Sequence, residues 1–119
     1  MSKLSVKIGR HIITYIDKGS DKSSFEALDV AEKLFAKNKF KYTEALIDRF
    51  DGMVLLCPEE QIGHHFVTAI CGYYGSGPMA SAQILDMFGF GQYEYLLAKI
   101  ATGGDMSNFH MIKDRGFVA

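Results

Sequence analysis

Residues 64–88 read HHFVTAICGYYGSGPMASAQILDMF, and this stretch decides the fold. An apolar run followed by closely spaced glycines predicts a strand from His64 to Tyr74 that passes through a glycine-rich loop into a helix. Pro78 suits the first position of that helix, where its missing N–H costs nothing. Gly89 is placed to end the helix. The stretch therefore predicts a strand–loop–helix unit.

The chain before this unit predicts two hairpins. Apolar and polar residues alternate on both sides of Gly9–Arg10, which indicates two strands joined by a tight turn. Asp51–Gly52 lies between two apolar-containing runs and predicts a second hairpin, in which residues 42–50 pair with residues 53–57. Residues 42–50 also fit one face of a helix. We predict a strand because Asp51–Gly52 is a typical hairpin turn.

A helix is predicted between the two hairpins, from about Ser24 to Lys37. The sequence Ser23-Ser24-Phe25-Glu26 matches a capping box, with Ser23 reaching the backbone of Glu26. Apolar residues then recur at helical spacing and predict one buried face. This face comprises Phe25, Leu28, Ala31, Leu34 and Phe35.

The chain after the unit predicts one more helix and a short tail. The helix runs from Gln92 to Ala101, with Tyr93, Leu96, Leu97 and Ile100 facing inward. The tail contains Phe109, Met111 and Phe117 and fits either an edge strand or a docked segment. The expected fold class is α+β: one domain spanning residues 1–119, with a mostly antiparallel sheet, one N-terminal helix and two C-terminal helices packed on it.

Composition limits the function classes. The 119 residues are 48% hydrophobic, which indicates a packed globule. The formal net charge of −1 argues against a binder of duplex nucleic acid. No stretch resembles a secretory signal or a membrane span, so we expect a cytoplasmic protein that has no membrane partner. Cys57 and Cys71 are the only cysteines, and we expect both to be reduced and buried.

The glycine-rich loop is the part of the sequence best suited to binding an anion. Gly75 and Gly77 let the backbone turn sharply and approach a ligand closely. The first N–H groups of the following helix lack intrahelical partners, and with the helix dipole they attract phosphate or carboxylate. The hydroxyls of Ser76 and Ser81 are expected to donate hydrogen bonds to the ligand, and the rings of Tyr73 and Tyr74 are expected to stack on a base. The neighbouring backbone at Pro78 and Met79 is expected to border the ligand.

Three known phosphate-binding loops match this segment only in part. Pro78 and Met79 occupy the Lys and Ser/Thr positions of a Walker A loop, which excludes an ordinary P-loop NTPase. Gly75 to Ala80 fits the dinucleotide pattern G-x-G-x-x-A, but a second helix is expected where that fold needs a strand. An acetyltransferase loop shares Gly75 and Gly77, but the Gln or Arg expected three residues earlier is Gly72. The glycines also fit a purely structural connection.

At residues 72–78, GYYGSGP, the chain resembles the Thoeris anti-defence sponge proteins of phages. The resemblance covers this loop, the preceding strand and the following helix, about a fifth of the chain, and it carries over to Gly75, Gly77 and Pro78. It implies a multimeric protein in a bacterial host cell. Such a protein would bind a cyclic ADP-ribose type signal without cleaving it and keep the signal from an immune effector.

A ligand with two phosphates needs positive charge beyond the loop. Arg115, Lys113 and Arg10 are the candidate cations, with a neighbouring subunit as one possible source. Asn108, after a glycine turn, is a further candidate for the pocket lining. No cofactor is expected. No metal site is expected either, because the cysteines and histidines lack ligand spacing.

No residue set forms a catalytic signature. Cys71 has no nearby base along its strand, and acidic residues such as Asp21 and Glu59 resemble solvated turn residues. The leading hypothesis is therefore a non-catalytic binder that sequesters a phosphorylated nucleotide signal. The alternatives are a small transferase or hydrolase with a pyrophosphate loop, and an interaction module without a small ligand. Aromatic residues point to the last class: Phe88, Phe90, Tyr93, Tyr95 and Phe117.

Overall fold

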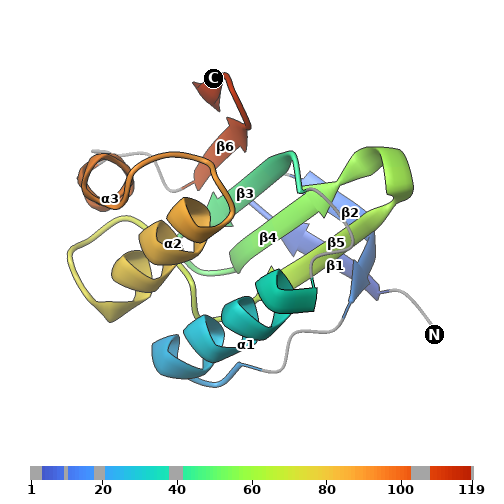
Figure 1. The fold of residues 1–119 in the computed structure, drawn as a ribbon, viewed down its shortest axis with the longest axis horizontal. Coiled ribbons are helices and arrows are strands. Elements are labelled where there is room, and N and C mark those ends of the chain that lie inside the picture. Colours follow the sequence, from blue (N-terminus) through green and yellow to red (C-terminus); the bar gives the residue numbers. More distant parts are fainter. Residues whose placement is uncertain (1–3, 10, 18–20, 38–41, 103–107, 119) are drawn as a thin grey trace.

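The computed structural model describes residues 4–9, 11–17, 21–37, 42–102 and 108–118. The described part contains a seven-stranded sheet and three α-helices (Figure 1). The elements in chain order are β1 (Leu4–Ile8), β2 (His11–Asp17), α1 (Ser24–Lys37), β3 (Glu44–Asp48), β4 (Gly52–Cys57), the short 3₁₀ helix η1 (Pro58–Glu60), β5 (Ile62–Phe66), α2 (Ser76–Met87), α3 (Tyr93–Ala101), β6 (Asn108–Ile112) and β7 (Gly116–Val118). The α+β class and the positions of the three helices in the chain are as expected.

The sheet is antiparallel except at one junction. Its strand order is β1-β2-β5-β4-β3-β6-β7. Only β2 and β5 run parallel, through the pairs Ile16↔Gly63 and Asp17↔His64. The sequence predicts the neighbouring hairpins but not this junction, because the two strands are separated by a helix and a hairpin.

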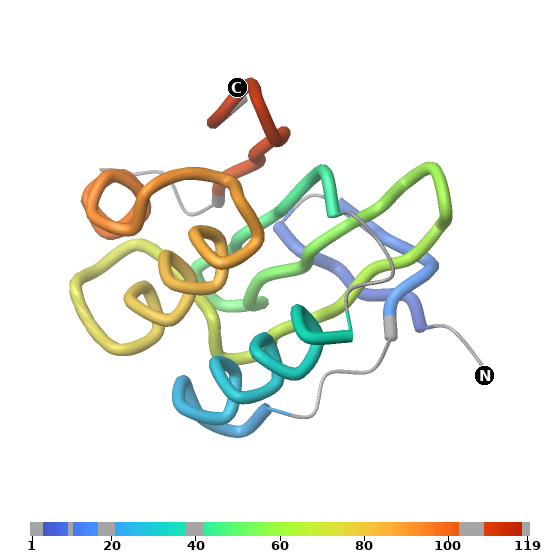
Figure 2. The backbone as a smooth tube through the Cα atoms, in the orientation of Figure 1, coloured from blue at the N-terminus to red at the C-terminus, as the bar shows by residue number. Residues whose placement is uncertain are grey.

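The helices cover one face of the sheet, and the N-terminal hairpin covers the other. The larger core cluster joins all three helices to inward residues of β3, β4, β5 and β6, including Ile47, Met53 and Phe66. A second cluster on the opposite face packs Ile8 and Ile16 against residues of β3 and β4. Figure 2 shows how the sheet coils so that β1 and β2 pass behind β4. Strands β3 and β4 are therefore buried on both faces.

Both predicted hairpins form. Strand β1 pairs with β2 around Gly9, and β3 pairs with β4 over five residue pairs. The second turn lies one step earlier than the dipeptide suggested. Gly52 is already paired with Asp48, and residues 49–51 form the loop. Gly52 has a φ of +94° and so supplies the positive φ at the end of the turn.

Helix α1 has the predicted bounds and a modified capping box. The Glu26 N–H donates to Ser23 Oγ at 3.2 Å, whereas the Glu26 carboxylate accepts from the Lys22 N–H rather than from Ser23. The predicted apolar face of α1 is only partly correct. The buried residues are Ala27 and Ala31, while Phe25 is 79% exposed. Small residues on the inner face let the helix backbone approach α2 and the sheet.

The predicted strand at 64–74 is wrong in its second half. Strand β5 begins at Ile62 and ends at Phe66. Beyond it, the carboxylate of Asp21 accepts hydrogen bonds from the N–H groups of Val67 and Thr68, at 3.0 and 2.8 Å. These amides bond to a side chain instead of a neighbouring strand, so residues 67–75 form a loop.

Helix α2 begins two residues earlier than predicted. Gly75 is the N-cap, so Pro78 occupies the third helical position. That position is still within the first turn, where an N–H has no intrahelical partner, so the proline is tolerated for the predicted reason.

The end of the chain is more regular than either expected alternative. Residues 108–118 form a hairpin of β6 and β7, and β6 pairs with β3. Phe88 and Phe90, which the interaction-module alternative would place at a surface, are buried in the larger core cluster. Tyr95 remains 56% exposed.

Candidate anion-binding site

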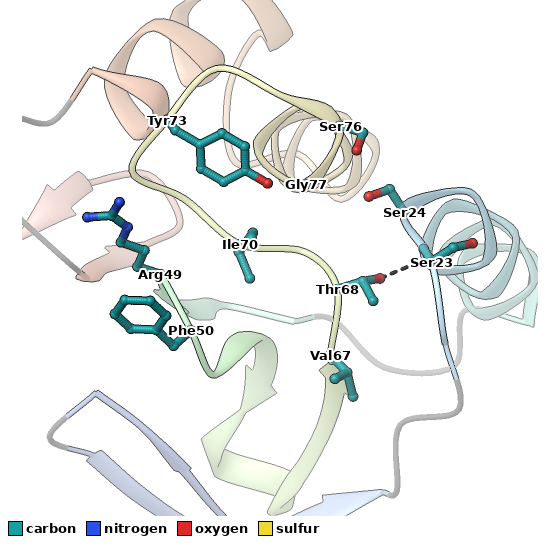
Figure 3. Close-up of a pocket in the computed structure, with 10 residues that line it drawn as sticks. All are labelled: Ser23, Ser24, Arg49, Phe50, Val67, Thr68, Ile70, Tyr73, Ser76 and Gly77. Atoms are coloured by element: carbon teal, nitrogen blue, oxygen red, sulfur yellow. Dashed lines mark hydrogen bonds between the residues drawn. The ribbon is translucent and has the colours of Figure 1, made fainter.

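An open hollow of about 520 Å³ lies where the N-termini of α1 and α2 approach the β3–β4 turn (Figure 3). Ten residues from three separate segments line it: Ser23, Ser24, Arg49, Phe50, Val67, Thr68, Ile70, Tyr73, Ser76 and Gly77. The volume falls in the range of small-molecule sites. The loop of residues 67–75 forms the floor and one wall.

The first turn of α2 presents uncapped backbone to the hollow. No side chain caps the helix at Gly75, and the first turn carries no acidic residue. Gly77 packs so closely that a Cβ would lie 2.6 Å from Cγ1 of Ile70 and 3.2 Å from the Tyr73 hydroxyl oxygen. Because Gly77 has no side chain, the first turn of α2 packs directly against the loop, next to Tyr73.

Helix α1 brings a second N-terminus to the same hollow. Ser23 and Ser24 line the wall opposite the loop, and the Ser24 and Ser76 hydroxyls lie toward one another in Figure 3. A helix N-terminus carries a partial positive charge of about half an elementary charge. Both ends therefore border one hollow.

A buried carboxylate fixes the start of α1 against the loop. Asp21 is 4% exposed and bonds the loop amides of Val67 and Thr68. The Thr68 hydroxyl lies 2.6 Å from Asp21 Oδ2 and 2.9 Å from the Ser23 carbonyl oxygen. These contacts set the spacing between the two helix ends.

The β3–β4 turn adds a cation and an aromatic ring. Arg49 is the one charged side chain among the ten lining residues, and its guanidinium carbon lies 5.6 Å from the centre of the Phe50 ring. The side chain of Asp48 holds the turn by accepting hydrogen bonds from the N–H groups of Phe50 and Asp51, at 2.8 and 2.9 Å.

The structure brings together part of the predicted site. Tyr73, Ser76 and Gly77 line the hollow. Tyr74, Gly75 and Met79 lie beside it in the same segment but outside the lining, and Tyr74 and Met79 are exposed. Pro78 is buried in the first turn of α2. Ser81 is also buried, and its hydroxyl donates to the Ile70 carbonyl oxygen at 2.8 Å, which holds the loop against the helix.

The predicted cations of the C-terminal part do not reach the hollow. Arg115 is exposed in the β6–β7 turn. Lys113 lies against Gly89, where a Cβ would be 3.1 Å from its Cε. Neither is among the residues that line the hollow. The backbone of Asn108 begins β6 and pairs with Asp48 of β3, and Arg10 lies outside the described residues.

Seven lining residues were not predicted as part of the site: Ser23, Ser24, Arg49, Phe50, Val67, Thr68 and Ile70. Ser23 was recognised only as a helix cap. The hairpin prediction placed Arg49 and Phe50 at the end of a strand over residues 42–50, whereas in the structure they lie in the turn after β3. Nothing local to these residues shows that the turn faces the loop of residues 67–75.

The Cys71 thiol, in the loop beside the hollow, is buried. Burial raises the pKa of the Cys71 thiol to about 12, so this thiol is protonated at neutral pH. The carboxylate of Asp48 adds to this rise and Arg49 opposes it. Within the described ranges, no group of three or more His, Cys, Asp or Glu residues is placed to hold a metal ion.

No helix in the described part of the chain is long and apolar enough to span a bilayer.

No protein-family model, curated protein or solved structure matches this chain.

Proposed function

We propose that this protein binds a small phosphate-bearing nucleotide in the hollow and does not transform it. The observation that carries the proposal is the convergence of two helix N-termini and Arg49 on one open site that aromatic rings border. Helix N-termini are common sites for phosphate groups because backbone N–H groups and the dipole both favour an anion. Arg49 adds a positive charge to the same hollow, which attracts an anionic ligand without requiring direct contact with its phosphates.

The charges around the hollow favour a phosphate. The two helix ends and the guanidinium supply roughly two positive charges. The opposing charges are the carboxylates of Asp21, Asp48 and Asp51, which lie outside the lining and already accept hydrogen bonds from backbone N–H groups. Glu26 lies in the first turn of α1, outside the lining, with its carboxylate bonded to the Lys22 N–H.

The lining favours binding over turnover. It contains hydroxyls, one guanidinium and apolar groups, and none of its ten residues is a histidine, carboxylate or thiol. General acid–base catalysis most often uses a group of that kind within hydrogen-bond reach of the substrate, and among these ten residues only the phenol of Tyr73 could serve instead. A protein that sequesters its ligand needs affinity alone.

The resemblance to Thoeris anti-defence sponges extends the proposal to a particular biological role. In that role the ligand is a cyclic ADP-ribose type signal, and a homo-oligomer keeps it from a bacterial immune effector. This extension rests on the loop of residues 72–78.

The test is thermal unfolding against ADP-ribose, its cyclic forms, cyclic dinucleotides, ADP and acetyl-CoA, with two matched variants. Ser76→Glu places a negative charge in the hollow, at the first residue of α2. An acidic residue there stabilises the free protein by about 0.3–1 kcal/mol through the helix dipole. Gln83→Glu makes the same charge change on an exposed position of the same helix.

A binding nucleotide at 100 times its Kd should add about 2.7 kcal/mol to the stability of the wild type and of Gln83→Glu. This corresponds to several degrees in Tm. Ser76→Glu should unfold at or above the wild-type temperature without ligand and should gain nothing from it. Ligand recovered intact after denaturation supports binding, whereas altered ligand supports the transferase or hydrolase alternative. An equal ligand response in both variants would mean that the ligand binds outside the hollow.

A further inference from the structure

Phe50 is an exposed aromatic side chain that the fold does not use for packing. It is 80% exposed, at the tip of the β3–β4 turn, and it lines the hollow. In Figure 3 it lies at the opposite end of the hollow from Ser24 and Ser76. The hollow thus has a polar end with two hydroxyls and two helix N-termini, and an aromatic end.

The backbone that presents Phe50 is held on several sides. The buried carboxylate of Asp48 accepts hydrogen bonds from the N–H groups of Phe50 and Asp51. The next residue is tied to the β1–β2 turn and to β5, because Asp51 Oδ2 accepts from the Gly9 N–H at 3.2 Å and its carbonyl oxygen lies 2.6 Å from His65 Nε2. A ring on a fixed turn loses little freedom when it binds, which favours affinity.

Arg49 connects the ring to the glycine-rich loop. Its guanidinium lies over Phe50, and its side-chain stem passes Gly72, where a Cβ would be 3.2 Å from Arg49 Cδ. Tyr73, the next residue of the loop, is 41% exposed and lines the same hollow. Two rings and a planar cation are therefore presented from two segments at one site.

We propose that Phe50 is the stacking platform for the base of the bound nucleotide, with Arg49 and Tyr73 bordering it. The base lies at the β3–β4 turn, and the phosphates lie at the end formed by Ser24 and Ser76. Recognition is by stacking, so adenine and guanine bind with similar affinity and a pyrimidine binds more weakly because it offers less surface. This assignment rests on the proposed function, since it places the base relative to the phosphate site.

The experiment measures the Kd of ADP, GDP, UDP and inorganic pyrophosphate by isothermal titration calorimetry. The variant is Phe50→Ala. The matched control is Phe25→Ala, which removes an equally exposed ring, 79% exposed, that does not line the hollow. Pyrophosphate carries the phosphate groups of the nucleotides without the base, so it reports on the phosphate end alone.

We expect Phe50→Ala to weaken ADP and GDP by about ten-fold, to leave pyrophosphate unchanged, and to bring ADP close to pyrophosphate in affinity. Phe25→Ala should change none of these values. If the wild type binds pyrophosphate as tightly as ADP, or if Phe50→Ala leaves ADP unchanged, the base platform is refuted while phosphate binding stands. If the wild type binds neither ADP nor pyrophosphate, the proposed function fails as well.

Discussion

Asp21 shows how far one side chain can act from its place in the sequence. Its neighbours Lys18 to Lys22 are polar, and this context indicates a solvated turn residue. In the structure its carboxylate is buried and bonds the amides of residues 67 and 68, which ends β5 and begins the glycine-rich loop. Its role depends on partners more than forty residues away, which no local pattern contains.

Cys71 allows a prediction of pH dependence at the residue scale. Burial raises the pKa of its thiol from 9.0 to about 12 in the folded protein, so the folded state holds the proton more tightly than the unfolded chain. The resulting contribution to stability is fully present below pH 9 and is lost as the pH rises toward 12. Between pH 8 and 10.5 this linkage should cost the wild type about 2 kcal/mol.

Urea unfolding of the wild type, Cys71→Ala and Cys57→Ala at these two pH values measures the effect. Cys71→Ala should lose less stability between pH 8 and 10.5 than the wild type does, and Cys57→Ala should follow the wild type. Equal losses in all three proteins would mean that the folded Cys71 thiol titrates near its ordinary value.

At the scale of elements, the β3–β4 turn shows how a backbone held by hydrogen bonds presents exposed side chains to the hollow. The Asp48 carboxylate stabilises the turn by accepting hydrogen bonds from the N–H groups of Phe50 and Asp51, and Gly52 ends the turn with a positive φ. A Cβ on Gly52 would lie 2.4 Å from the Phe66 carbonyl oxygen, so the turn also packs tightly against the end of β5. Glycine is therefore required at this position for both conformation and space.

Gly52→Ala should destabilise the protein more than Gly116→Ala. Both glycines have positive φ, at +94° and +76°, so alanine costs about 1–2 kcal/mol in backbone strain at either position. Only Gly52 also faces a backbone clash, since nothing lies within 4 Å of a Cβ on Gly116. Chemical denaturation should show a total loss of about 3 kcal/mol or more for Gly52→Ala. Equal losses for the two variants would show that the turn moves to make room.

At the scale of the whole molecule, the coiling of the sheet decides which surfaces are buried. The N-terminal hairpin crosses the back of β3 and β4 and reaches β6, where the rings of His11 and His110 lie 5.7 Å apart. Its junction with the rest of the sheet is the parallel pairing of β2 with β5 at Ile16 and Gly63. This hairpin should be the part of the molecule that separates most easily.

Gly63→Val should loosen the N-terminal hairpin selectively. A Cβ at Gly63 would lie 2.5 Å from Ile16 Cδ1 and 2.9 Å from Leu56 Cδ2, so a larger side chain pushes β2 away at a cost of about 1–3 kcal/mol. Hydrogen exchange should become faster at the amides of β1 and β2 and stay nearly unchanged in α2 and β4. A uniform increase across all elements would mean that the hairpin does not open separately from the rest.

The sequence by itself determined the elements whose signals are local. Turn glycines and alternation marked both hairpins, the capping box and apolar spacing marked α1, and the glycines with Pro78 marked the start of α2 to within two residues. These features depend on backbone conformation and on neighbours within one or two turns, which the sequence lists directly. Of the residues that it predicts for a ligand site, Tyr73, Ser76 and Gly77 line the hollow.

Only the tertiary structure determined which segments contact one another and which side chains are buried. The parallel junction of β2 with β5, the burial of Phe88 and Phe90, and the exposure of Phe25 follow from how the sheet coils under the helices. The hollow needs the start of α1, the β3–β4 turn and the loop of residues 67–75 at one place. Such a site depends on long-range packing and on a buried carboxylate, and these act through space between segments that the sequence keeps apart.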